Sequence, residues 1–196
     1  MRRAAEGPPR GYDSAFPMGQ VPSVAQAGPG DGPEADMIDT SKVTDRRRLH
    51  FDNPRQLHSD VDRIVASERT GTLRRTGNWT TGQILGHLAA WIDYAYDGYP
   101  VKPPWFIKFI LRFAKKRFLR GPLKVGVKIP KVPDGTYATE PLSVDEGLAR
   151  FNRAWARLQD RPPTAPNILF GPLTHEEWIQ LNLRHAELHL GFLHPR

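Results

Sequence analysis

The residues best suited to chemistry are two histidines near the C-terminus, His185 and His189. On a helix, residues four apart are neighbours on one face, so their imidazole nitrogens can converge on one metal ion. The flanking apolar residues place the pair on a buried stripe, where two imidazoles without partners would cost roughly 1 to 3 kcal/mol each. A shared metal ion or backbone carbonyls could supply the partners, and the spacing alone does not decide between them.

His87 is the best candidate for a third ligand. A catalytic zinc site usually has three protein ligands and one open position, so the pair needs a donor from another element. Ile84 lies three residues before His87 and Trp91 four residues after it, which places this histidine on the buried stripe of its own helix. The other histidines are weaker candidates because they lie near polar, first-turn or terminal positions: His50, His58, His175 and His194.

Four segments are predicted to form the helices that position these side chains. Each has a capping residue followed by apolar residues at helical spacing, at Asn53-Pro54, Thr80, Ser143 and Thr174. The second is expected to end at about Asp97, the third before Pro162-Pro163 and the last at about Leu193. Because strand-like alternation is absent, the sequence predicts an all-α four-helix bundle. A second apolar stripe on the last helix indicates that this helix is either central or packed on a second subunit.

The connection between the second and third helices, residues 98–142, is too long for a simple bundle loop. Residues 105–120 are predicted to form an extra basic amphipathic helix there, and residues 125–129 could be a short extended piece. Ten Lys or Arg and no Asp or Glu occur from Lys102 to Lys131. The helix either covers the bundle end as a lid or makes peripheral contact with an anionic membrane. Nucleic acid is disfavoured because no recognisable module surrounds the basic segment.

Composition excludes several classes of protein. The chain has no cysteine, so any metal must be held by histidine or carboxylate. It has no apolar run long enough to span a membrane and no signal peptide, so we expect a cytoplasmic location. Residues 1–40 are rich in Pro, Gly and Ala and are expected to be a disordered tail, with the helical domain at 41–196. Met37 follows this tail, so translation could start there.

The sequence resembles the DinB/YfiT-like four-helix bundles, and most closely a branch of unknown function. The resemblance covers most of Arg47 to Pro195 and is carried by Arg47-Arg-Leu-His-Phe51, Gly77-Asn-Trp-Thr-Thr-Gly-Gln-Ile-Leu-Gly-His-Leu88, Phe170-Gly-Pro-Leu-Thr-His-Glu-Glu-Trp178 and His185-Ala-Glu-Leu-His-Leu190. It implies an up-and-down bundle, often dimeric, with a long crossover between helices two and three. It also implies a divalent metal on His87, His185 and His189.

The resemblance further implies an enzyme that acts on a small molecule. Characterised relatives include transferases and isomerases that use bacillithiol or mycothiol, and others are described as metal-dependent hydrolases. We therefore expect zinc or nickel, with an exogenous low-molecular-weight thiol as a candidate co-reactant. Gln83, Tyr94 and Asn182 share faces with the histidines and could orient ligands or substrate. Glu187 projects to the opposite side, which argues against a zinc-protease base. The rival hypothesis is a non-catalytic bundle that binds a membrane or a protein partner through residues 105–120.

Overall fold

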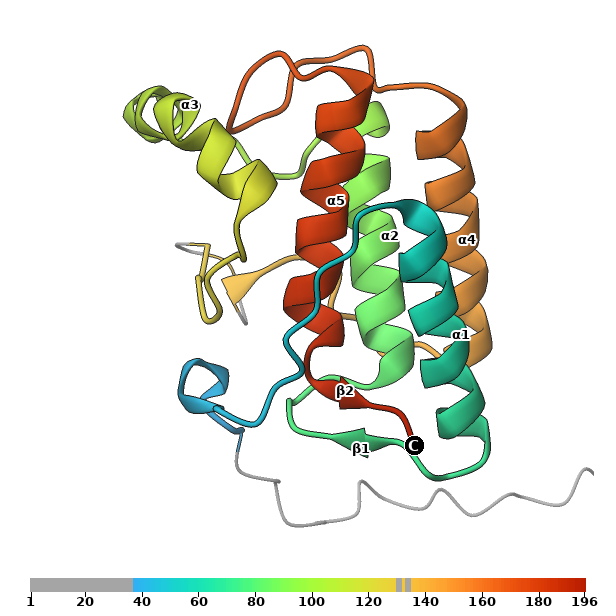
Figure 1. Ribbon diagram of the computed structural model, residues 1–196. Helices are drawn as coiled ribbons and strands as arrows, with labels where there is room; N and C mark the ends of the chain where they lie inside the picture. Colours follow the sequence, from blue (N-terminus) through green and yellow to red (C-terminus); the bar gives the residue numbers. More distant parts are fainter. Residues whose placement is uncertain (1–36, 130–131, 133–134) are drawn as a thin grey trace, which may run out of the picture. The chain divides into compact units, whose positions relative to one another are not determined.

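The computed structural model describes residues 37–129, 132 and 135–196, and this part of the chain is mostly helical (Figure 1). Its α-helices are α1 (Pro54–Arg69), α2 (Thr81–Asp97), α3 (Trp105–Arg120), α4 (Val144–Asp160) and α5 (His175–Leu190). The short elements are a 3-10 turn, η1 (Thr40–Lys42), and two antiparallel strands, β1 (Arg74–Arg75) and β2 (Leu193–His194). The predicted all-α class is confirmed.

The predicted start signals are found at the start of four helices. The Asn53 side chain accepts a hydrogen bond from the backbone N–H of Gln56 at the start of α1. Both bonds of a capping box are present at Thr80, Ser143 and Thr174, which precede α2, α4 and α5. These bonds satisfy backbone donors that the first turn of a helix cannot satisfy itself. Local sequence therefore sets where α2 and α5, the helices that carry the histidines, begin.

Three expectations need correction or lie outside the described residues. The last helix ends at Leu190 and not at Leu193, because Leu193 and His194 leave it to pair with β1. The extended piece predicted at 125–129 is wrong, since Val125 and Gly126 form a turn with a left-handed glycine (φ 73°). The disordered tail was predicted at 1–40, and residues 1–36 of it lie outside the described residues, whereas Ile38 is bonded through its backbone to the Asn78 side chain.

Helices α1, α2, α4 and α5 lie side by side, and α3 lies outside this group next to α5 (Figure 1). One hydrophobic core fills the space between the four helices and includes Leu57, Leu85, Phe151 and Trp155. The second apolar stripe of α5 faces this core, since Leu183, Ala186 and Leu190 are fully buried. Because the stripe is covered within the chain, α5 is a central helix.

A glycine contact brings α2 and α4 unusually close together. A Cβ added at Gly147 of α4 would lie 2.5 Å from the carbonyl oxygen of Gly82 and 2.9 Å from its Cα atom. Both neighbours are backbone atoms, which cannot rotate away as a flexible side chain could. Glycine at position 147 therefore sets the distance between α4 and the helix that carries His87.

Residues 43–52, here called the strap, run alongside α5 before α1 begins (Figure 1). Arg46 donates to the carbonyl of Leu188 (2.6 Å), and the backbone N–H of Arg47 donates to the carbonyl of Gly191 (2.8 Å). The last carbonyls of a helix have no partner within the helix, and cations are favoured near them. The strap therefore supplies hydrogen-bond donors for backbone carbonyls at the C-terminal end of α5, close to the histidine pair.

A buried ion pair fastens the strap to α1. Arg47 contacts both carboxylate oxygens of Asp60, at 2.8 and 2.7 Å, and the Asp60 side chain is only 1% exposed. Further along the strap, the Phe51 backbone N–H donates to Glu187 of α5, and its carbonyl accepts from Arg184. These contacts fix α1 and α5 relative to each other through a segment that is neither helix nor strand.

The close approach of α2 and α4 gives a stability prediction. Gly147→Ala should lower the free energy of unfolding by about 1 to 3 kcal/mol, because the methyl group would overlap backbone atoms of α2. In an unconstrained helix the same change should stabilise by about 1 kcal/mol. Urea unfolding followed by circular dichroism measures the difference. Asn152→Ala, on the exposed face of α4, is the control and should change the free energy by less than about 0.5 kcal/mol. An unchanged or raised value for Gly147→Ala would contradict the proposed contact.

Candidate metal centre

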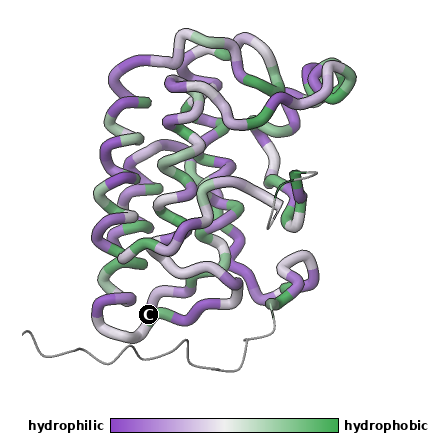
Figure 2. The backbone as a smooth tube through the Cα atoms, turned by 180° about the vertical axis from the view of Figure 1, so that it is seen from behind, coloured by the Kyte–Doolittle hydropathy of each residue, from purple (hydrophilic) through white to green (hydrophobic). Residues whose placement is uncertain are grey.

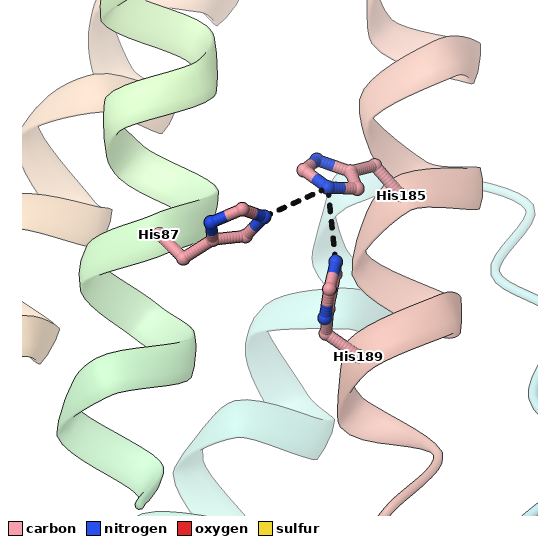
Figure 3. Close-up of side chains that lie close together, drawn as sticks. All are labelled: His87, His185 and His189. Carbon is pink, nitrogen blue, oxygen red and sulfur yellow. Dashed lines mark hydrogen bonds between the residues drawn. The ribbon is translucent and has the colours of Figure 1, made fainter. Parts of the chain in front are cut away.

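The three predicted histidines meet between α2 and α5 (Figure 3). His185 Nε2 lies 3.3 Å from His87 Nε2 and 3.1 Å from His189 Nε2. One nitrogen of each ring lies within 4.8 Å of the others, which is close enough for a shared ion. His87 is buried, whereas His185 and His189 keep part of their surface exposed. This three-histidine cluster could therefore hold a metal ion.

A backbone carbonyl orients the ring of His87. Its Nδ1 lies 3.0 Å from the carbonyl oxygen of Tyr137, which can only accept a hydrogen bond. A neutral imidazole has one N–H, so donation from Nδ1 leaves Nε2 with a free lone pair that points at the other two rings. Metal-binding histidines usually have this arrangement, in which the second nitrogen donates to a carbonyl or a carboxylate. The chemistry of this donor set fits a metal ligand.

The three rings do not have enough N–H protons to pair all the nitrogen atoms that face one another in the cluster. His185 Nε2 is close to both other Nε2 atoms, but a neutral ring can donate to only one of them through this atom. The Nε2 of His87 has no proton to donate, because its N–H is used at Tyr137. A shared cation would bind all three lone pairs at once. The arrangement therefore fits a metal better than it fits a self-sufficient hydrogen-bond network.

Burial keeps the three imidazoles neutral. It lowers the pKa of His87 to about 4, although the bond to the Tyr137 carbonyl works in the opposite direction. Burial also lowers the pKa of His185 and of His189 well below the usual value, and the neighbouring imidazoles add to this effect. Protons compete with metal ions for histidine nitrogens, so neutral rings at pH 7 favour metal binding.

Two tryptophans line the cluster. The indole of Trp79 stacks on His189 with ring centroids 5.2 Å apart and planes 9° apart, and its centroid lies 4.9 Å from that of His87. The ring centroid of Trp91 lies about 6 Å from those of both His87 and His185. The rings of these two tryptophans thus pack against all three histidine side chains.

Comparison with known proteins identifies the family. A family model described as "Protein of unknown function (DUF1569)" matches residues 43–196. The chain belongs to this family. The matched span begins with the strap and contains the three histidines and the five α-helices of the described residues. No curated protein and no solved structure matches the chain, so the DUF1569 assignment gives the family without an activity.

The three weaker site candidates of this DUF1569 protein contact groups other than the three imidazoles. Gln83 accepts from the Thr80 backbone in the capping box and donates to the carbonyl of Thr139 (3.1 Å). Asn182 is buried and donates to the Trp178 carbonyl within α5 (2.9 Å). Tyr94 contacts the ring of Trp91, and burial raises the pKa of its phenol. A direct role for these three residues at the cluster stays a prediction.

Gln83 and His87 together hold one part of the crossover against α2. Their partners are the carbonyls of Thr139 and Tyr137, on either side of Ala138. Ala138 has a φ of 59°, a left-handed conformation that costs a non-glycine residue on the order of 1 kcal/mol. The two flanking hydrogen bonds keep it there. The contribution of Gln83 is thus to position the segment that orients His87.

Trp79 and Tyr137 also surround the cluster, although their place there was not predicted from the sequence. Trp79 precedes the helix cap at Thr80, so helical spacing does not indicate which way its ring points. Tyr137 acts through its backbone carbonyl, which any residue could supply, so its side chain gives no signal. Trp91 lies four residues after His87 on α2, and this spacing did predict that the two side chains share one stripe of the helix.

Metal affinity should depend on the three clustered histidines and not on histidines elsewhere in the chain. His189→Ala should lower the affinity for Zn²⁺ or Ni²⁺ at least about 100-fold, because loss of a mere supporting contact already costs 10- to 100-fold. His175→Ala is a matched control on the same helix, since His175 bonds the Leu158 carbonyl and lies at the start of α5. Isothermal titration of metal-free protein measures both affinities. Equal affinities in the two variants would argue against the cluster as the metal site.

An apolar residue in place of His185 should affect the free energy of unfolding much less in the metal-free protein than in the metal-bound protein. In chelator, His185→Leu should leave the free energy of unfolding unchanged or raise it by about 1 kcal/mol, since it removes a buried polar ring with few partners. The wild type should gain about 4 kcal/mol when free metal is 1,000 times Kd, and the variant should gain almost none. Thermal unfolding with and without Zn²⁺ tests both statements. A large destabilisation of the variant in chelator would show that the cluster is a hydrogen-bonded structural unit.

Proposed function

We propose that this DUF1569 protein is a DinB-like metalloenzyme that acts on a small molecule through a zinc or nickel ion held by His87, His185 and His189. The observation that carries the proposal is the meeting of three imidazole nitrogens within 4.8 Å. Imidazole suits zinc and nickel, and three protein ligands are the number that catalytic zinc sites use when one position stays open. Structural zinc sites usually have four protein ligands.

The order of the helices supports the DinB-like part of the proposal. The histidines come from α2 and α5, which are the second and fourth of the four helices that lie side by side. The connection between α2 and α4 is long and contains α3, as the resemblance implies for the crossover. The three histidines that the resemblance implies as ligands thus come from the helices that it implies.

The reaction classes follow from what the chain lacks and what a metal would supply. Three neutral nitrogen donors would hold an ion that can lower the pKa of a bound water towards about 7 or activate a bound thiol. The chain has no cysteine, so a reacting thiol has to come from solution. We therefore propose either hydrolysis or transfer involving a low-molecular-weight thiol.

The surrounding residues would prepare the site for a substrate. The indole N–H of Trp91 is buried and has no hydrogen-bond partner among the described residues, although its ring adjoins His87 and His185. An unpaired buried donor costs about 1 to 3 kcal/mol, and a substrate acceptor could satisfy it. Glu187 accepts from the Phe51 backbone and pairs with Arg184 at 2.8 Å. That carboxylate is thus committed to the fold and is not the base.

Metal analysis and turnover together test the proposal. Protein purified without an affinity tag or chelator should carry about one zinc or nickel ion per chain. In a screen of thiol transfer and ester or amide hydrolysis, His189→Ala should abolish any turnover found while the circular dichroism spectrum stays unchanged. His175→Ala should keep both the ion and the turnover. A turnover that survives His189→Ala or metal removal would refute the proposed enzyme, and a metal-free native protein with no affinity for either ion would do the same.

A further inference from the structure

Helix α3 exposes large apolar side chains on the face that points away from α5. Five of its aromatic and aliphatic residues are between 50% and 78% exposed: Trp105, Phe106, Phe109, Ile110 and Phe113. They are spaced at four-residue intervals in two rows, so they form one stripe along the first half of the helix. Leaving such a stripe in water is unfavourable, and contiguous exposed apolar patches usually mark an interaction site.

The opposite face of α3 already has its partners. Lys115 pairs with Glu177 of α5 at 2.6 Å, the ring of Phe118 lies 5.2 Å from that of Phe170, and Leu119 is buried. The second half of α3 is thus fixed to the body of the protein. The first half extends beyond the four helices, and Figure 2 shows hydrophobic and hydrophilic residues alternating along it. Its apolar stripe is therefore free to meet a flat surface.

Basic side chains accompany the stripe. Five cations lie on α3 outside its contact with α5: Lys108, Arg112, Lys116, Arg117 and Arg120. Within residues 37–129, 132 and 135–196, none of these five forms an ion pair. The whole stretch from Lys102 to Lys131 contains no acidic residue. Exposed aromatic residues beside unpaired cations match the chemistry of an anionic lipid surface, where rings enter the interface and cations meet phosphate groups.

We propose that α3 docks this protein on an anionic membrane surface, with Trp105, Phe109 and Phe113 in the headgroup layer and the basic residues on lipid phosphates. The helix has 16 residues, and none of the helices in the described part of the chain could cross a bilayer. Docking is therefore peripheral, with α3 lying in the interface plane.

Charge decides between a lipid surface and a second copy of this chain as the occupant. Two α3 helices that packed their apolar stripes together would bring five cations of one copy near five of the other, with no acidic residue between Lys102 and Lys131 to compensate. Like charges across an interface are costly. An anionic bilayer instead attracts each basic residue that comes near its surface.

Vesicle sedimentation with the full chain tests the docking. The protein should bind vesicles of phosphatidylcholine with phosphatidylserine, bind neutral phosphatidylcholine vesicles far more weakly, and dissociate as salt is raised. The double variant Arg112→Glu and Lys116→Glu should lower the partition coefficient at least about tenfold. The matched control, Arg55→Glu with Arg153→Glu, makes the same charge change at exposed positions of α1 and α4 and should keep most of the binding.

A second pair of variants separates apolar insertion from simple charge attraction. Phe109→Ser with Phe113→Ser should also lower binding at least about tenfold, whereas Val127→Ser, another exposed apolar position, should not. Replacement of all three clustered histidines by alanine should leave vesicle binding intact, so the metalloenzyme and the docking can fail independently. Equal binding to neutral and anionic vesicles would overturn the proposal. So would a lack of binding to anionic vesicles, and a dimer that the Phe109→Ser and Phe113→Ser variant dissociates would then identify a second copy of the chain as the partner of the stripe.

Discussion

The constraint on which the rest depends is the placement of three neutral imidazoles so that their nitrogens face one another. One nitrogen of His87 is committed to the Tyr137 carbonyl, and the remaining nitrogens within the cluster offer more lone pairs than protons. Protonation does not resolve this, because burial and the adjacent rings disfavour positive charge on any of them. A shared metal ion could resolve it with one interaction, since the three nitrogens lie close enough together to hold one ion.

Holding that cluster requires α2 and α5 to keep a fixed separation and register, although neither helix does so alone. Gly147 lets α4 approach the start of α2, and the strap binds the last carbonyls of α5 through Arg46 and Arg47. Beyond α5, the pairing of β2 with β1 fixes the chain immediately after the histidines. The two helices are thus positioned by contacts at their ends, and the region between them remains available for the imidazoles and the tryptophan rings.

Much of this fold could be predicted from the sequence because helix starts are local events. The caps at Asn53, Thr80, Ser143 and Thr174 depend on residues three positions apart, and all four helices begin where these signals predict. The end of α5 was predicted three residues too far, because β2 forms through a partner more than a hundred residues away in sequence. No local pattern contains that information.

In the site, too, features set by neighbouring residues could be predicted, whereas contacts with residues distant in sequence could not. Helical spacing placed His185 and His189 on one face, and the buried stripe of α2 suggested His87 as the third member. Spacing also suggested Gln83, but it could not show that the Gln83 side chain is used in a helix cap and on the Thr139 carbonyl. The backbone of the crossover supplies the partner of His87, and a carbonyl group is common to every residue. Side-chain chemistry was therefore predictable, whereas its orientation by the backbone was not.

Two features of this chain oppose what stability alone would favour, and they lie on adjacent helices. Imidazoles with too few partners occupy the space between α2 and α5, while aromatic side chains that could fill a core are exposed on α3. Apolar residues in place of the buried imidazoles, and polar residues in place of the exposed aromatic side chains, would make the isolated fold more stable. Such costs are expected where a ligand completes the structure. A cation would bind the imidazoles, and an anionic surface would cover the exposed side chains of α3. Because these two ligands carry opposite charge, the two places would not compete for the same ligand.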